Sequence, residues 1–180
     1  MSDTAQSVTI RYAIMPSPIG ELFIAATASA VVHLAFENHD FHSVRAKLEA
    51  AYGMPVQRDD AALEYATQQL AEYFAGTRKY FELPVQQPAP DRFMTRVQQN
   101  LSSIPYGETR SYGQFATQLE NPGAARAVGS ACARNPIPLI QPCHRVVRSD
   151  GSHGEFSGTA GAKQYLLAFE RGERPSAPTS

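Results

Sequence analysis

SYGQFATQLENPGAARAVGSACARNP, residues 111–136, predicts two short helices joined by a turn. Ser111 can cap the first helix, and the ENPG stretch then turns the chain. The second helix consists of small residues and ends before Pro136, because proline disfavours helical backbone in the residue before it. This is the helix-turn-helix pattern, which an ordinary helical hairpin shares.

The predicted second helix, residues 124–135, favours one kind of nucleic-acid contact over another. Its Ala, Gly and Ser positions allow close approach to a surface, and Arg126 is the long side chain on its early turns. A helix that reads the major groove normally carries several polar side chains for base edges, and this helix has few. Contact with the minor groove, or recognition of shape, fits it better.

Charge is unevenly distributed along the chain, although the net charge is only −1. Residues 1–90 carry 6 basic and 10 acidic side chains, whereas residues 91–180 carry 10 basic and 7 acidic ones. Every basic residue of the second half except Lys163 is arginine, whose planar head suits phosphates and insertion between bases. The second half is therefore the candidate nucleic-acid face, although a surplus of this size is common on protein surfaces.

The first half of the chain predicts strands followed by helices. Three β-rich runs, at residues 8–15, 20–27 and 30–37, are separated by turn residues such as PSPIG. Helical patterns follow at residues 41–52 and 59–76. The second has a core face at helical spacing, formed by Leu63, Ala66, Leu70 and Phe74.

The stretch PVQQPAP, residues 84–90, is typical of a linker. A helix should begin after it, with Asp91 as its N-cap and an apolar stripe of Phe93, Val97, Leu101 and Ile104. We therefore predict an α+β fold, in which a domain of strands and helices precedes a mostly helical domain containing the helix-turn-helix. The boundaries that we expect are 1–85, a linker at 86–90, a second domain at 91–172, and a disordered tail at 173–180.

Composition excludes several classes of protein. No apolar run approaches the roughly 20 residues that a membrane-spanning helix needs, so we expect no membrane partner. The start of the chain does not have the pattern of a secretion signal, and two cysteines are a poor disulfide scaffold, so a reducing cytoplasm is expected. His33, His39 and His42 are close in sequence without a cysteine or carboxylate set, which favours packing or surface roles over a metal site.

Cys143 and His144 are neighbours in QPCHRVV, residues 141–147. Three prolines stiffen the approach to the cysteine, and HRVV favours a short buried strand. A free thiol needs a base to become a nucleophilic thiolate at neutral pH, and His144 could supply one. Because neighbours on an extended segment face apart, a water molecule would have to bridge them. The alternative is that Cys143 is simply a small buried apolar residue.

Three segments resemble the O6-alkylguanine-DNA alkyltransferase family, over roughly residues 91–172. RAVGSACARNPIPLIQPCHRVV is similar to the active-site region, IPYGETRSYGQFA to the entry into the helix-turn-helix, and GEFSGTAGAKQYLLAFE to the active-site loop and final helix. The first 90 residues match only in size and element order. The resemblance implies a ribonuclease-H-like N-terminal domain, and transfer of an alkyl group from O6-alkylguanine, and from O4-alkylthymine, to a cysteine.

The resemblance also implies roles for individual residues. Cys143 would be the alkyl acceptor, His144 its base through a water molecule, and Glu170 the carboxylate that orients His144. Tyr112 would contact the flipped base, and Arg126 would fill the gap that the base leaves. The remaining positions brace the site (Asn135), cover the guanine (Phe156 and Ser157) or lie near the DNA backbone (Gly113, Asn121 and Ser149).

The product of such a transfer is a thioether, so one molecule would repair one lesion. The resemblance implies a monomer without cofactor or metal, acting on double-stranded DNA, and leaves cooperative binding open. Departures from the family pattern include Gln141 in an apolar position, Gln98 in place of tryptophan, and Phe156 in place of tyrosine. The resemblance therefore does not predict the shape of the pocket. The alternatives are a non-catalytic protein that binds alkyl lesions and a cysteine hydrolase that turns over repeatedly.

Overall fold

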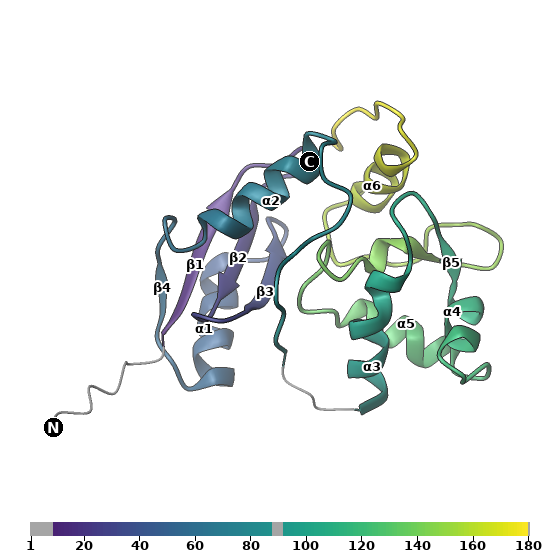
Figure 1. The fold of residues 1–180 in the computed structure, drawn as a ribbon, viewed down its shortest axis with the longest axis horizontal. Coiled ribbons are helices and arrows are strands. Elements are labelled where there is room, and N and C mark those ends of the chain that lie inside the picture. Colours follow the sequence, from purple (N-terminus) through teal and green to yellow (C-terminus); the bar gives the residue numbers. More distant parts are fainter. Residues whose placement is uncertain (1–8, 88–91, 180) are drawn as a thin grey trace, which may run out of the picture.

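The structure, a computed structural model, describes residues 9–87 and 92–179 (Figure 1). It has the predicted α+β fold. The N-terminal domain contains β1 (Ile10–Met15), β2 (Leu22–Ala26), β3 (Val31–Phe36), α1 (Phe41–Tyr52), β4 (Val56–Arg58) and α2 (Glu64–Phe74). The C-terminal domain contains α3 (Arg92–Asn100), the 3₁₀ turn η1 (Leu101–Ser103), β5 (Arg110–Ser111), α4 (Tyr112–Gln118), α5 (Ala125–Ala133), the 3₁₀ turn η2 (Cys143–Arg145), β6 (Val146–Val147) and α6 (Ala162–Glu170). Asp91 and residues 88–90 of the predicted linker lie outside the described residues.

The N-terminal sheet has the strand order β3-β2-β1-β4. The three predicted strands pair antiparallel in chain order, whereas β4 pairs parallel with β1 after the chain has passed through α1. The sequence did not predict β4, because it has only three residues and only Val56 among them is buried. So short a strand shows no periodicity, and its pairing with β1 defines it.

Helices cover both faces of this sheet (Figure 1). All five residues of β2 are buried, since alternate side chains of a strand point to opposite faces and each face here is covered. Leu22 and Ile24 belong to the cluster that α2 covers, and Phe23 and Ala25 to the cluster under α1. The sheet is therefore a buried layer, and α2 separates it from solvent on the side of the C-terminal domain.

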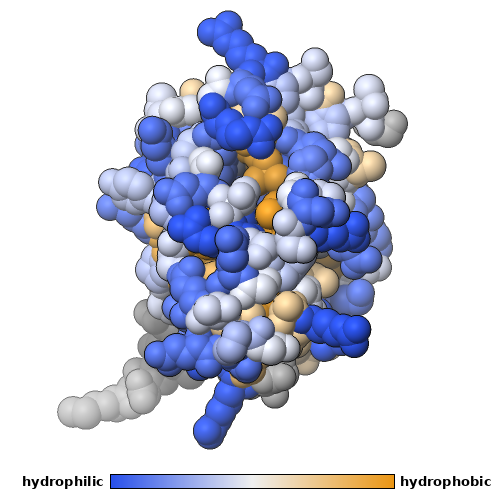
Figure 2. Space-filling view, turned by 90° about the vertical axis from the view of Figure 1, so that its right-hand side faces the viewer, coloured by the Kyte–Doolittle hydropathy of each residue, from blue (hydrophilic) through white to orange (hydrophobic). Residues whose placement is uncertain are grey.

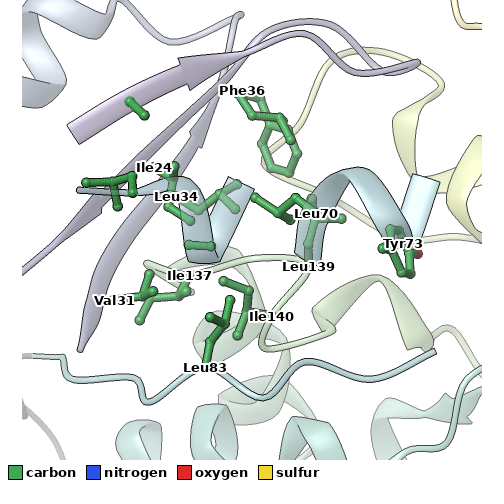
Figure 3. Close-up of a cluster of buried hydrophobic side chains, with 14 of the residues drawn as sticks. Ile24, Val31, Leu34, Phe36, Leu70, Tyr73, Leu83, Ile137, Leu139 and Ile140 are labelled. Carbon is green, nitrogen blue, oxygen red and sulfur yellow. The ribbon is translucent and has the colours of Figure 1, made fainter. Parts of the chain in front are cut away.

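Helix α2 begins at Glu64 rather than at residue 59, because Asp59 closes a turn by accepting a hydrogen bond from Ala62 N (3.0 Å). Its predicted core face is buried, with one difference. Tyr73 is only 1% exposed, whereas Phe74 is partly buried. Figure 3 shows Tyr73 at the end of this cluster, beyond the aliphatic side chains of the sheet.

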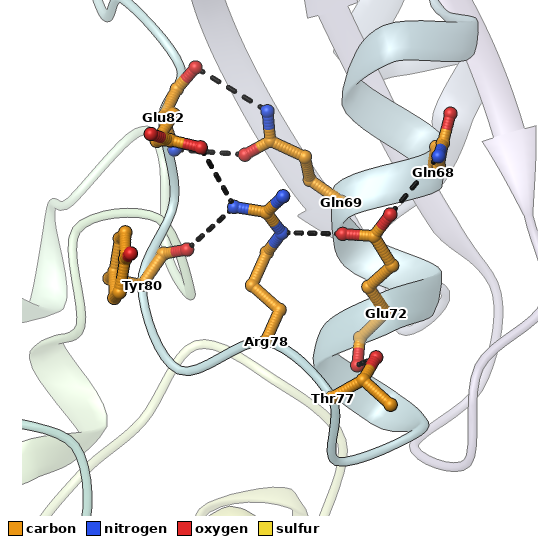
Figure 4. A network of polar contacts seen from close by, with 7 residues as sticks. All are labelled: Gln68, Gln69, Glu72, Thr77, Arg78, Tyr80 and Glu82. Carbon is orange, nitrogen blue, oxygen red and sulfur yellow. Dashed lines mark hydrogen bonds and ion pairs between the residues drawn. The ribbon is translucent and has the colours of Figure 1, made fainter.

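A polar network ties the end of α2 to the chain that follows it (Figure 4). Arg78 Nε donates to Glu72 Oε2 (2.7 Å), and the side-chain amide of Gln69 exchanges hydrogen bonds with the backbone N (2.9 Å) and O (3.4 Å) of Glu82. These bonds hold the chain between residues 78 and 82 against α2. Phe81 is thereby fixed beside the helix end.

The predicted helix-turn-helix is formed by α4 and α5. Ser111 caps α4 as predicted, within a capping box: Gln114 N donates to Ser111 Oγ (3.1 Å), and Ser111 N donates to Gln114 Oε1 (2.8 Å). In the connection, the left-handed backbone belongs to Glu120 (φ 59°), and not to a glycine. Both helices pack with α3 on a cluster that includes Val97, Phe115 and Val128.

The two domains share one hydrophobic cluster. Leu34 N, on β3, donates to Pro136 O (2.9 Å), and the segment that follows inserts Ile137, Leu139 and Ile140 against the sheet. The segment that leads to Cys143 is thus held by both domains.

Within residues 9–87 and 92–179, no helix combines the length and apolar character needed to cross a membrane.

Candidate active site

Cys143 and His144 lie on the 3₁₀ turn η2, whereas a strand was predicted over HRVV, from His144 onward. Pro142 (φ −79°, ψ 69°) forms an inverse γ-turn, in which Cys143 N donates to Gln141 O (2.8 Å). Arg145 N then donates to Pro142 O (3.1 Å), so the chain is extended only in β6. The strand prediction was therefore wrong for the first two residues, because Pro142 begins a turn that the β-propensity of the valines does not reveal.

His144 is fully buried and forms a 2.7 Å hydrogen bond with Glu170, from Nε2 to Oε1. An ionised carboxylate only accepts hydrogen bonds, so Nε2 carries the proton of the neutral ring and Nδ1 has the free lone pair. Nδ1 is buried and has no hydrogen-bond partner among the described residues. The arrangement gives the ring one anchored nitrogen and one basic nitrogen.

Glu170, the last residue of α6, accepts hydrogen bonds at both oxygens. Arg145 binds it in a bidentate manner, with Nε 2.9 Å from Oε2 and Nη2 3.0 Å from Oε1. Gly107 N donates to Oε2 (3.2 Å) and Tyr73 Oη donates to Oε1 (2.7 Å). A buried carboxylate that accepts this many hydrogen bonds is held in a fixed orientation as the anion.

The pKa values around this pair follow from burial and from charge. Burial acts to raise the pKa of Glu170, but the hydrogen bonds and charges of His144 and Arg145 outweigh it and hold that pKa well below its usual range. For His144 burial is the dominant cause and lowers the pKa, although Glu170 opposes it. The resting pair is therefore a neutral imidazole beside a carboxylate.

Cys143 is a free thiol that is only 3% exposed. Burial raises its pKa, while a hydrogen bond from the Asn135 side chain and the positive charge of Lys163 act in the opposite direction. Asn135 also donates from Nδ2 to Gln141 O (2.7 Å) and accepts from Ile137 N (3.1 Å), which fixes both ends of the turn before Cys143. The thiol is therefore protonated at rest and needs a base to react.

Gln141 occupies an apolar environment. It is 2% exposed, and its side-chain Oε1 and Nε2 have no hydrogen-bond partner among the described residues. A buried amide without partners costs free energy, because its bonds to water are lost and not replaced. Within the described ranges, no protein group forms a hydrogen bond that would offset the burial of this amide.

Tyr112 begins α4 and is partly buried beside the loop that follows β6. Its ring lies 6.0 Å from Lys163 Nζ, and its hydroxyl lies where a side chain at Gly154 would have to be, which requires glycine there. Burial, followed by the proximity of the Cys132 and Cys143 thiols, raises the pKa of Tyr112 to about 12. The phenol therefore stays protonated at neutral pH and is available as a hydrogen-bond donor.

The loop containing Phe156 and Ser157 contacts both domains. The ring of Phe156 lies 5.3 Å from that of Phe36 and 6.5 Å from the imidazole of His144. Ser157 O accepts hydrogen bonds from His39 Nε2 (2.9 Å) and from the side-chain amide of residue 38 (3.2 Å). These two hydrogen bonds at Ser157 therefore hold the loop against the N-terminal domain.

The residues expected near DNA are separate from this buried centre. Arg126 is exposed on the first turn of α5, Asn121 is exposed in the turn before it, and Ser149 is exposed after β6, while Gly113 lies in the first turn of α4. The face of the C-terminal domain is mostly hydrophilic, with hydrophobic residues visible in a hollow near its middle (Figure 2).

The sequence did not predict the three contributors that come from the N-terminal domain, Tyr73, His39 and Asn38. They are far from Cys143 in sequence, and His39 was expected only to pack or to face solvent. Arg145 lies in QPCHRVV, residues 141–147, but no role was predicted for it. Among the described residues, no group of three or more His, Cys, Asp or Glu side chains could hold a metal ion.

Two family models match the chain. The 6-O-methylguanine DNA methyltransferase ribonuclease-like domain matches residues 10–87, and the DNA binding domain of the same proteins matches residues 92–172. The methylated-DNA–protein-cysteine methyltransferase of Mycobacterium tuberculosis is 38% identical over 93% of this chain and 96% of its own length. The constitutive enzyme of that name from Bacillus subtilis is 38% identical over 88% of this chain and 91% of its own.

Solved structures agree with these matches. The crystal structure of Mycobacterium tuberculosis OGT in complex with DNA superimposes with a TM-score of 0.80 at 36% identity, covering 94% of this chain and 97% of that one. That of the Mycobacterium tuberculosis O6-methylguanine methyltransferase gives a TM-score of 0.77 over 93% and 96%. With both domains matched and the Cys143–His144–Glu170 geometry in place, the chain belongs to the 6-O-methylguanine DNA methyltransferase family.

Proposed function

We propose that this protein repairs DNA by moving the alkyl group of O6-alkylguanine to Cys143. The observation that carries the proposal is a buried thiol one residue from a histidine whose Nε2 is anchored on an ionised carboxylate. Family membership supports the substrate, and the helix-turn-helix of α4 and α5 supports binding to double-stranded DNA. O4-alkylthymine is a second lesion with the same reactive carbon–oxygen bond. The protein acts on both lesions as a monomer without a cofactor.

Activation of the thiol is the first chemical step. Burial keeps Cys143 protonated at rest, so the proton must leave as the reaction proceeds. His144 Nδ1 accepts it through one water molecule, and the resulting imidazolium is stabilised by Glu170 at the other nitrogen. Asn135 positions the turn and hydrogen-bonds the sulfur, which lowers the energy of the thiolate.

The second step is displacement at a saturated carbon. The sulfur–carbon bond forms as the bond from that carbon to O6 breaks, and the electron pair of the broken bond passes to the guanine. Tyr112 donates a proton to the base, the imidazolium of His144 releases the thiol proton to solvent, and solvent reprotonates the phenolate. The product is a thioether and an unmodified guanine, and since no group here regenerates the thiol, each molecule acts once.

Access to the base requires that it leave the stack, because the reactive carbon is inside the duplex. We infer that α5 approaches the minor groove and that Arg126 fills the vacated position. Phe156 and Ser157 then cover the base in the pocket. Gly113, Asn121 and Ser149 contact the DNA backbone around it.

The test is intact-mass spectrometry after incubation with a duplex that contains O6-methylguanine. Wild-type protein should gain one methyl group and then stop, with the group on Cys143. Cys143→Ala should bind the duplex without gaining mass, and Cys132→Ala, the matched buried thiol, should still be methylated. Repeated turnover would indicate a hydrolase, binding without transfer would indicate a lesion-binding protein, and a methyl group on Cys132 would overturn the assignment.

A further inference from the structure

Tyr73 connects the N-terminal domain to the proton-transfer pair. It lies on the last turn of α2, 97 positions before Glu170, and its Oη donates to Glu170 Oε1 at 2.7 Å. The same oxygen accepts from His144 Nε2, also at 2.7 Å, and from Arg145 Nη2 at 3.0 Å. Among the described residues, Tyr73 is the one donor to this carboxylate that comes from outside the C-terminal domain.

The ring of Tyr73 is held on several sides by other rings. Phe74 (5.1 Å between centroids), Phe81 (5.5 Å), Phe169 (5.9 Å) and Tyr106 (6.0 Å) surround it. Phe81 is itself fixed by the polar network at the end of α2 (Figure 4). A ring confined in this way presents its hydroxyl in one direction, so the donor is placed before any substrate binds.

We propose that Tyr73 is a positioning residue, through which the N-terminal domain sets the orientation of Glu170 and the proton affinity of His144. The proposal rests on the proposed function, because it assigns His144 the role of base. It gives the N-terminal domain a part in the reaction in addition to its structural contribution.

The physical reason is competition for one oxygen atom. Oε1 shares its negative charge among three donors, and the neutral hydroxyl of Tyr73 takes part of the charge that would otherwise stabilise a proton on His144. Burial and the neighbouring carboxylate keep the phenol protonated, because they raise its pKa well above the usual value. Tyr73 is therefore a constant donor over the whole working range of pH.

Other charged and titratable groups face the same pair. Arg145, from η2, contacts both oxygens of Glu170, and Tyr106 lies near Glu170 with its ring 5.7 Å from the Arg145 guanidinium. Lys163, from α6, acts on His144 through its charge and donates from Nζ to Val146 O (2.6 Å). Removing the Tyr73 hydroxyl leaves all of these groups in place, so a change in pH dependence reports on that hydroxyl.

The test compares Tyr73→Phe with wild type in single-turnover methyl transfer from an O6-methylguanine duplex, as a function of pH. Phenylalanine keeps the ring contacts and removes only the donor. The plateau rate constant should fall by about 2- to 10-fold, the factor that one hydrogen bond is worth. The acidic limb, where protonated His144 cannot accept the thiol proton, should move to higher pH by about half a unit to one unit. DNA affinity should not change.

Two controls separate positioning from stability. Tyr52→Phe removes a buried hydroxyl of the N-terminal domain that has no partner among the described residues, and should leave both rate and profile unchanged. Leu70→Val reduces burial in α2 and should lower the melting temperature without moving the acidic limb. In a Glu170→Gln background, the addition of Tyr73→Phe should not move the acidic limb of the pH profile any further.

The outcomes are distinct. If wild-type protein transfers no methyl group, the proposed function fails. If wild type reacts and Tyr73→Phe has the same pH profile, the positioning role of Tyr73 is wrong even if the melting temperature falls. Should Tyr73→Phe not fold, 3-fluorotyrosine placed at position 73 keeps the hydroxyl and strengthens it as a donor, so it should move the acidic limb to lower pH. An unchanged limb there also overturns the proposal.

Discussion

At the scale of single residues, the proposed reaction depends on one nitrogen atom, Nδ1 of His144. It is basic because Nε2 is engaged by Glu170, and Glu170 is ionised because Arg145, Tyr73 and Gly107 donate to it. A lone buried carboxylate would take up a proton and lose this property. The hydrogen bonds to Glu170 therefore support the proposed base by keeping this carboxylate ionised.

The first prediction removes this base. His144→Ala should slow methyl transfer by about 10²–10⁴-fold, the usual contribution of one positioned base. Glu170→Gln should also slow it, because the amide NH₂ can donate to Nε2 and drive the ring proton to Nδ1. The pKa of Glu170 lies well below its usual range, so acid should act on the rate through His144 and not through Glu170. Single-turnover rates from pH 5 to 9 would check this, and a thiol pKa equal to that of wild type in both variants would exclude the relay.

The second prediction concerns the buried amide of Gln141, both of whose polar atoms have no partner among the described residues. Gln141→Met keeps the length of the side chain and removes the polar atoms, so the free energy of unfolding should rise by about 1–3 kcal/mol. Gln98→Met is the matched control: Gln98 is equally buried but donates to Ala131 O (3.0 Å) and accepts from Gln87 (2.8 Å). That variant should be destabilised. Urea denaturation of both measures the difference, and a loss of stability in Gln141→Met would contradict the expectation.

At the scale of elements, α5 separates a buried side from an exposed one. Val128, Ala131 and Cys132 face the core, while Arg126 lies exposed on the first turn. Its small residues let the helix approach a surface closely, and its one long cationic side chain is near the end that follows the turn. This arrangement suits insertion of a single side chain better than readout along a groove.

The third prediction tests that insertion. Arg126→Ala should reduce repair in a duplex sharply, because unstacking a base costs a few kcal/mol and nothing would then hold the base out. Reaction with free O6-benzylguanine needs no flipping and should be nearly unaffected, provided the pocket admits that group. Loss of a phosphate contact alone would instead weaken binding to all DNA. It would also reduce the slope of log binding constant against log salt concentration by about one unit. An equal loss of rate on both substrates would show that Arg126 supports the pocket or the fold.

The elements that were predicted correctly are those defined by local periodicity or caps. The N-cap at Ser111, the core face of α2 apart from Phe74, and the first three strands all follow from neighbours in the chain. Of the elements that were missed, β4 depends on a distant partner, since its pairing with β1 defines it, whereas η2 depends on the local turn at Pro142. Short segments do not contain enough residues to show a pattern.

The same distinction applies to the site. Cys143, His144 and Glu170 were predictable because they lie in motifs that resemble a known family, and the hydrogen bond between His144 and Glu170 is within one domain. Tyr73 and His39 were not predictable, because each meets the site from the other domain and their spacing in sequence has no periodic meaning. Only the folded chain places them there.

At the scale of the whole molecule, the domains are joined by the elements that hold the candidate active site. The Phe156–Ser157 loop is held by Asn38 and His39, the carboxylate by Tyr73, and the approach to Cys143 packs on the N-terminal sheet. A disturbance of the domain interface should therefore reach the site. One titratable group at this interface, His33 on β3, provides a way to measure its contribution.

The fourth prediction is that the protein loses stability in mild acid through His33. This residue lines a cavity of about 360 Å³ between β3, α1 and residues 133–136. Burial, and then the nearby charge of His39, lowers the pKa of His33 from 6.5 to about 4. The unfolded chain therefore binds a proton at a higher pH than the folded one does. The stability is fully present above pH 6.5 and is lost as the pH falls from 6.5 towards 4, by about 2–3 kcal/mol.

The measurement is the free energy of unfolding from urea titrations between pH 7 and 4. His33→Gln cannot take up a proton and should reduce the slope in this window. The slope that remains should have the same sign, because burial lowers the pKa of His144 as well. Glu170, whose pKa is held below its usual range, contributes only at pH values below about 4.5, the unperturbed value for that side chain. His42→Gln, at an exposed position of α1, is the control and should keep the wild-type slope. If His33→Gln kept it too, the acid sensitivity would belong to the active-site pair and not to the interface between the domains.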